Sequence, residues 1–182
     1  CREAARLASE RGLSVGGVLC PSRRDGAGMA LEIEVESAAT GERRSLASRE
    51  RELGGPRWPP GGDRGFSFSE EGFAWALAIL RADLGLAGRH GGTDLLVIDE
   101  IGPVELVLRA GFRPFLDEMG EAGSRCGLIV ATVRPSLADE LARLPPFAAA
   151  RRLTVEAPTR GALPLAVARE ASRLRAKTAN SQ

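Results

Sequence analysis

The sequence is nearly without lysine, since only one of its 25 lysine and arginine residues, Lys177, is a lysine. It also lacks an excess of charge of either sign, because 24 acidic residues balance the basic ones to a formal net charge of +1. A protein that coats nucleic acid or an anionic membrane needs a cationic surplus. The balance therefore argues against nucleic acid as a partner and against attachment to a charged membrane.

Long apolar runs and paired cysteines are absent as well. The runs Leu95–Ile98 and Leu128–Ala131 have the length of strands, and no apolar run of the sequence approaches the roughly 18 residues that a membrane span needs. The N-terminus does not resemble a signal peptide, which would be basic and then apolar. The three cysteines form neither a Cys-x-x-Cys pair nor a disulfide framework. We therefore expect a cytoplasmic protein in a reducing compartment, with no membrane segment.

What is present is a chain of 182 residues, 43% hydrophobic, which suits a single domain with one core. Continuous apolar runs at 94–99 and 126–132 predict buried central strands of a parallel sheet. Helices alternate with these strands, so we predict one α/β domain over 1–182, a three-layer sandwich with a mostly parallel sheet. Alternation at 29–36 and a second short segment at 44–47 predict an additional antiparallel hairpin.

The remaining elements follow from capping and breaker signals. Residues 50–65 are rich in glycine and proline and are predicted to form a flexible loop within the domain. Further strands are predicted at 13–20 and 153–156. Further helices are predicted at 2–11, from Ser69 to about Leu86, at 113–122, from Ser136 to about Leu144, and at 162–177.

Two adjacent carboxylates, Asp99 and Glu100, end the first buried strand. Ligands of open α/β sheets bind beyond the carboxyl ends of the strands, so both acids are expected to reach the binding crevice. Phosphoryl transfer uses such a pair: one acid holds Mg²⁺, usually through water, and the next orients or deprotonates the attacking water. An aspartate after a strand also often marks the N-cap of a helix, and the pattern alone leaves both interpretations open.

The first residues support the Mg²⁺ interpretation. Residues 2–11 predict a helix that begins without an N-cap residue. In a P-loop domain the pattern Gly-x-x-x-x-Gly-Lys-Ser/Thr leads into such a helix, and its lysine contacts the β- and γ-phosphates. We therefore expect the chain to be a fragment, with the first strand, the phosphate-binding loop and its lysine before Cys1. The coding sequence upstream tests this expectation.

Several segments together carry a resemblance that extends over nearly the whole chain. They are Gly16–Pro21, Ala39–Glu42, Val97–Leu106, Ala131–Arg134 and Leu153–Val155, which leads to Arg160. With these segments the sequence resembles the small P-loop nucleoside-triphosphatases, and the Asp-Glu-Ile-Gly-x-x-Glu-Leu stretch is the most specific part. The family tends to carry lysines near positions 66 and 103, where this chain has Phe66 and Pro103.

The resemblance implies Mg²⁺-dependent hydrolysis of a nucleoside triphosphate such as ATP or GTP. It makes Asp99 the acid on the Mg²⁺ side and Glu100 the catalytic base. Glu105 matches the family's acid after this strand, where it either tunes the Mg²⁺ and the water or is a solvated loop residue. Gly102, in the same motif, is placed with the nucleotide-binding residues.

Three further residues are candidates for the same site. Thr132 ends the next strand, where it either senses the γ-phosphate or bonds the backbone. Arg134 and Arg160 are candidates for binding phosphate or base, because a guanidinium contacts phosphate through two parallel hydrogen bonds. With 24 arginines in the chain, each can equally be a solvated charge.

Two other functions remain open. One is a nucleotide kinase of the same fold, which requires a site for the acceptor. The other is a nucleotide-gated binding or assembly module, in which hydrolysis only switches a surface for a partner. The fragment itself is expected to bind nucleotide poorly and to hydrolyse little, and no protein partner is predicted.

Overall fold

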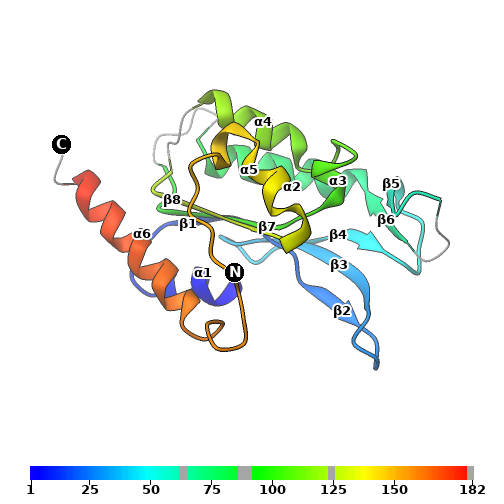
Figure 1. Cartoon of the computed structure of the whole chain (residues 1–182), viewed down its shortest axis with the longest axis horizontal. Coiled ribbons are helices and arrows are strands. Elements are labelled where there is room, and N and C mark those ends of the chain that lie inside the picture. Colours follow the sequence, from blue (N-terminus) through cyan, green and yellow to red (C-terminus); the bar gives the residue numbers. More distant parts are fainter. Residues whose placement is uncertain (62–64, 86–91, 123–125, 180–182) are drawn as a thin grey trace.

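The computed structural model describes residues 1–61, 65–85, 92–122 and 126–179. They form one sheet with helices on both faces: α2, α4 and α5 lie on one side, and α1 and α6 on the other (Figure 1). The elements are, in chain order, α1 (Arg2–Ser9), β1 (Val15–Leu19), β2 (Ser22–Arg24), β3 (Ala30–Ser37), β4 (Arg43–Ser48), β5 (Gly54–Trp58), β6 (Phe66–Ser69), α2 (Glu70–Asp83), β7 (Leu95–Ile101), α3 (Pro103–Leu106), α4 (Arg113–Ala122), β8 (Leu128–Val133), the 3-10 turn η1 (Pro135–Leu137), α5 (Ala138–Ala142), the 3-10 turn η2 (Pro145–Phe147) and α6 (Leu163–Ala179).

The sheet is mixed, so the prediction of a mostly parallel sheet is wrong. Its strand order is β5-β6-β4-β3-β1-β7-β8, with β2 paired to β3 off this path. Only β1 with β7 and β7 with β8 are parallel in the described chain, and the other pairings are antiparallel. The segment 94–99 is confirmed as a buried central strand by β7, whereas the segment 126–132 corresponds to β8, an edge strand whose residues are all partly exposed. The predicted hairpin is extended by further antiparallel strands that the sequence pattern does not reveal.

The segment 50–65, predicted to be a flexible loop, contains a strand. β5 pairs antiparallel with β6 and is the last strand of the sheet on that side. An edge strand tolerates a proline such as Pro56, because one side of the strand makes no ladder hydrogen bonds. Residues 62–64 of this segment lie outside the described residues.

Two other elements also differ from prediction. The segment 153–156 is not a strand. Its apolar residues Leu153 and Val155 are 49% and 58% exposed. Alternation of apolar residues produces a strand only where a partner strand pairs with the segment. Of the helix predicted from Ser136 to about Leu144, only α5, Ala138–Ala142, is α-helical. Ser136 lies within the preceding 3-10 turn η1 and does not cap the helix.

The helix predicted from Ser69 is confirmed. The Ser69 hydroxyl accepts the Gly72 backbone N–H at 3.0 Å, as an N-cap does. The helix ends at Asp83, and its predicted end near Leu86 lies outside the described residues. In the described part of the chain, no helix combines the length and apolar character that a membrane crossing requires.

β7 is the central buried strand that its apolar run predicts. Leu96 and Ile98 pack into a core below α2 and α4, whereas Leu95 and Val97 pack into a second core with α1 and α6. All four side chains are at most 1% exposed. Cores on both faces hold β7 firmly, so the residues at its carboxyl end have a rigid support.

Candidate functional site

Asp99 and Glu100 lie at the carboxyl end of β7, between the two strands that run parallel to it. β1 lies on one side and β8 on the other, so the carboxyl ends of three parallel strands meet here. The end of β1 leads into Cys20, and the end of β8 carries Thr132. This is the edge of an α/β sheet at which ligands bind.

A β-bulge shapes this edge. Asp99 and Glu100 together lie opposite the single residue Thr132, because the register shifts between β7 and β8. The flanking pairs are Ile98 opposite Ala131 and Ile101 opposite Val133. A bulge redirects the side chains of the longer strand, and bulges are common next to active sites.

The Asp99 carboxylate is held by both neighbouring strands. Thr132 Oγ1 donates to Asp99 Oδ1 at 2.7 Å, and the backbone N–H of Cys20 donates to Oδ2 at 3.2 Å. Each carboxylate oxygen can accept a second hydrogen bond or bind a cation. Carboxylate oxygens are ligands that Mg²⁺ prefers, so Asp99 fits such an ion, directly or through water.

Glu100 has a strained backbone and an exposed side chain. Its φ of 64° lies in the left-handed region, which costs a residue with a Cβ about 1–2 kcal/mol. Its backbone N–H donates to Thr132 Oγ1 at 2.9 Å, so one hydroxyl contacts both acidic residues. Desolvation and the neighbouring Asp99 carboxylate raise the pKa of Glu100, while Arg134 and Arg24 act in the opposite direction.

Glu105 is buried behind this pair. The residue is only 3% exposed, and its two carboxylate oxygens accept the backbone N–H groups of Gly102 at 2.9 Å and of Phe112 at 3.2 Å. Burial raises the pKa of Glu105 to about 7, although these hydrogen bonds lower it. Glu105 is therefore not a solvated loop acid, and its contacts are with the backbone around the site.

Two other predicted residues, Gly102 and Arg134, lie next to the acid pair on different elements. Gly102 is the N-cap of α3, and a Cβ there would meet only ordinary contacts, the nearest at 3.6 Å from the Glu100 carbonyl oxygen. The fold itself therefore does not require glycine at this position. Arg134 directly follows β8, is exposed, and lies near enough to Glu100 to lower its pKa.

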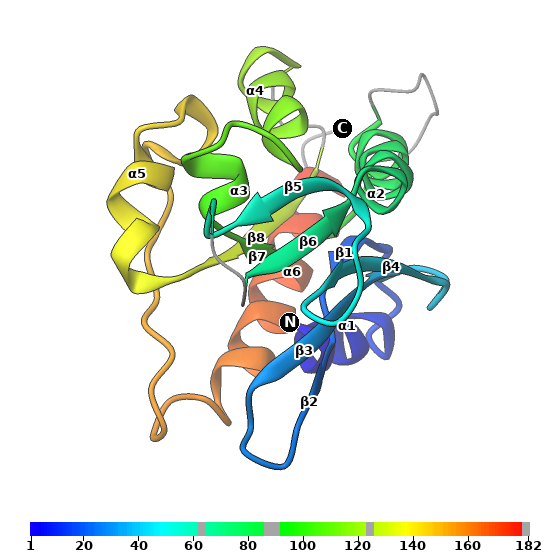
Figure 2. The same cartoon turned by 90° about the vertical axis from the view of Figure 1, so that its right-hand side faces the viewer.

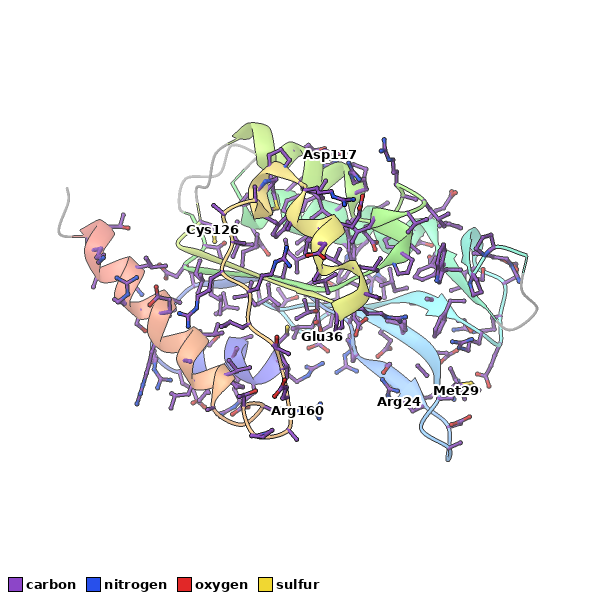
Figure 3. The ribbon with its side chains drawn as sticks, in the orientation of Figure 1. Arg24, Met29, Glu36, Asp117, Cys126 and Arg160 are labelled. Atoms are coloured by element: carbon purple, nitrogen blue, oxygen red, sulfur yellow. The ribbon has the colours of Figure 1, made fainter. Side chains whose placement is uncertain are left out.

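Arg160 is not brought to the acid pair by any contact in the described structure. It is exposed, in the segment that leads into α6 on the α1 side of the sheet (Figure 3). Its backbone N–H donates to the Glu156 carbonyl at 2.9 Å. The sequence pattern joined this arginine to the site, but the geometry does not.

Sequence reasoning missed three neighbours of the site. Cys20 holds Asp99 through its backbone, and burial together with the nearby carboxylates raises the pKa of its thiol well above the usual value. Arg24 on β2 (Figure 3) counteracts the charge of Glu100. Arg2 on α1 is paired with the buried Glu36, and the Asp99 charge adds to this pairing in raising the pKa of Arg2. Cys20 lies in the segment Gly16–Pro21 that carries the family resemblance. A single sequence does not show which strand ends lie side by side, so it does not join these residues to the acid pair.

No three histidine, cysteine, aspartate or glutamate side chains of the described residues gather into a metal-ligand cluster. Nucleotide-bound Mg²⁺ does not need one, because one or two carboxylates complete a shell made of phosphate oxygens and water.

Comparisons with known proteins agree with this geometry. The family model described as NTPase matches residues 1–168. The chain belongs to the NTPase family. The matched range includes every candidate residue of the site, and nucleoside-triphosphate hydrolysis is the general activity class of an NTPase.

A solved structure has a fold similar to that of this NTPase. The solution structure of a human cancer-related nucleoside triphosphatase matches it with a TM-score of 0.58 and 20% sequence identity. The match covers 90% of this chain and 85% of that chain. No curated protein matches the sequence. At this identity the structural likeness shows a shared fold, and roles of individual residues must come from the site.

Proposed function

We propose that this NTPase hydrolyses nucleoside triphosphates, such as ATP or GTP, in the presence of Mg²⁺ at the carboxyl end of β7. The observation that carries the proposal is the bulge, which sets Asp99 and Glu100 opposite one hydroxyl, Thr132, that contacts both residues. Family membership supports the class of reaction. The geometry of the site supports different roles for the two acids, with Asp99 holding the metal ion and Glu100 acting on the attacking water.

Asp99 is the residue that would hold Mg²⁺, through water or directly. Its carboxylate is fixed by Thr132 and by the Cys20 backbone, so it presents a preorganised negative charge. When bound, Mg²⁺ neutralises charge on the β- and γ-phosphate oxygens. The protein's part is to hold this carboxylate in one orientation.

Glu100 is the residue that would orient the attacking water and take its proton. The water oxygen bonds to the γ-phosphorus as the bond from that phosphorus to the β–γ bridging oxygen breaks, giving a nucleoside diphosphate and phosphate. A general base is most effective when its pKa is near the working pH, and the pKa of Glu100 is raised. Its exposed side chain is accessible to water and substrate.

Arg134 and Arg24 supply positive charge beside Glu100. A guanidinium donates strong hydrogen bonds to phosphate oxygens, so both arginines suit contact with the terminal phosphates. Neither residue comes from β7, because Arg134 follows β8 and Arg24 ends β2. The nucleotide would therefore lie where the ends of several strands meet.

Phosphate release from nucleoside triphosphates tests the proposal. The pattern Gly-x-x-x-x-Gly-Lys-Ser/Thr is not among these 182 residues, so the assay uses the protein as encoded in full. We expect release that stops with a chelator of divalent cations. We expect Glu100→Gln to lower the rate about 10²- to 10⁴-fold, the usual contribution of a general base, with nucleotide still bound.

Glu71→Gln is the matched control, because Glu71 is exposed in the first turn of α2 and lies outside the site. Unchanged turnover in Glu100→Gln would show that Glu100 is not the base. Transfer of phosphate only to an added nucleotide acceptor would indicate a kinase. Nucleotide binding without turnover in the wild type would indicate a gated binding module.

A further inference from the structure

The buried carboxyl of Glu105 has no role yet in the proposed reaction. It lies in α3, the short helix that starts three residues after Glu100, and α3 packs beside β5 (Figure 2). The carboxyl of a residue that is 3% exposed has lost most of its hydration, which costs several kcal/mol unless polar partners replace the water. Among the described residues, the backbone N–H groups of Gly102 and Phe112 are such partners, and no side-chain cation is seen to bond this carboxyl.

These two N–H groups belong to opposite ends of the segment 102–112, which contains α3 and the loop after it. Gly102 is the residue just before α3, and Phe112 is the residue just before α4. Glu105 Oε2 bonds the first and Oε1 bonds the second, so a single carboxyl connects both ends of the segment. Gly111 leaves room for this arrangement, because a Cβ there would lie 2.3 Å from Oε1.

Hydrogen bonds to Thr132 and Glu105 hold the backbone at and just after Glu100, the residue with the strained φ. The N–H of Glu100 itself is bonded by Thr132, and the N–H of Gly102, two residues later, is bonded by Glu105. A non-glycine residue keeps a left-handed φ only where its surroundings fix it. Glu100 at φ 64° is thus held by a side chain on each side of its position.

We propose that Glu105 is a positioning residue of the hydrolytic site, which holds the backbone after Glu100 and thereby sets where the Glu100 carboxylate lies. This inference rests on the proposed function of Glu100. It assigns Glu105 no contact with water, Mg²⁺ or phosphate. Removing its two hydrogen bonds should therefore slow the chemical step while leaving nucleotide binding in place.

Glu105→Gln tests this role with little change in size. A carboxamide has one oxygen, so at least one of the two N–H groups loses its acceptor. We expect kcat to fall roughly 10- to 100-fold, as misplacement of a catalytic group does, with KM and nucleotide Kd changed by less than about threefold. Glu105→Asp, which is one methylene shorter, should show the same pattern, and Glu71→Gln should show no change.

Amide hydrogen exchange at Gly102 and Phe112 gives a second readout that does not depend on turnover. Both amides should exchange slowly in the wild type and faster in Glu105→Gln. If the wild type releases no phosphate, the hydrolysis proposal fails, and the exchange rates still show whether Glu105 holds the loop.

Three results would overturn the positioning role. The first is unchanged exchange at both amides in the variant. The second is faster exchange with unchanged kcat in an active enzyme. The third is loss of folding in both Glu105→Gln and Glu105→Asp, judged by thermal unfolding, since Glu105 would then serve general stability and not the site.

Discussion

The hydroxyl of Thr132 connects the two acidic residues of the site. It donates its hydrogen to Asp99 and accepts the N–H of Glu100. A threonine hydroxyl has a single hydrogen to donate, so in this arrangement none is left for a phosphate oxygen. The predicted role in sensing the γ-phosphate would thus require Thr132 to release Asp99.

Glu105 gives a prediction at the same scale, for stability against pH. Its pKa is raised from 4.5 to about 7 in the folded protein, so the folded state binds a proton that the unfolded chain releases. Stability should therefore fall as the pH rises from about 4.5 to about 7, by roughly 3 kcal/mol at most, and level off above. Urea unfolding between about pH 5 and about pH 8 measures this.

Glu105→Gln should remove most of this dependence, because an amide does not titrate in this range. Glu100 also has a raised pKa and contributes with the same sign, so some slope should remain. Glu71→Gln serves as the control and should keep the wild-type slope. A slope that is equal in Glu105→Gln and in the wild type would contradict the assignment.

Among the elements, β1 determines how closely the site's strands approach. Gly17 has a φ of +92°, and a Cβ there would lie 2.0 Å from the Val97 carbonyl oxygen on β7. Its N–H donates to Asp83 Oδ2 at 2.7 Å, which connects the end of α2 to the middle of β1. Only glycine lets the backbone of β1 lie against β7 at this point.

Gly17→Ala should therefore destabilise the fold by about 2–5 kcal/mol, combining a left-handed alanine with a steric clash. Gly28→Ala is the matched control, because Gly28 has a similar φ of +83° but nothing within 4 Å of a Cβ. Gly28→Ala should cost only the conformational part, about 1–2 kcal/mol. Equal losses for the two variants in urea unfolding would show that the close approach to Val97 has no energetic effect.

For the whole molecule, the sequence predicted the buried strand β7, the strand β8 and the acid pair, but not the sheet. The apolar runs of β7 and β8 are local signals, and both segments form strands, although β8 is an edge strand whose residues are all partly exposed. The assignment of the two carboxylates after β7 to a catalytic site stays a prediction. The order of strands in a sheet depends on contacts between segments that are distant in the sequence. Local patterns do not show these contacts, so the antiparallel side of the sheet was not predicted. The burial of Glu105 was not predicted for the same reason, since its contacts with Gly111 and Phe112 involve residues that follow later in the chain.

The position of β8 at one end of the sheet has a practical consequence. All six of its residues, Leu128–Val133, are partly exposed, and it is the last strand of the order in the described chain. An apolar strand with unpaired backbone groups along one side is a template for pairing with another chain.

Molecules of this 182-residue chain should therefore associate with one another as their concentration rises. Sedimentation over a range of concentrations tests this, and a monomer throughout would show that the edge is protected. The purified chain should therefore self-associate through the free edge of β8.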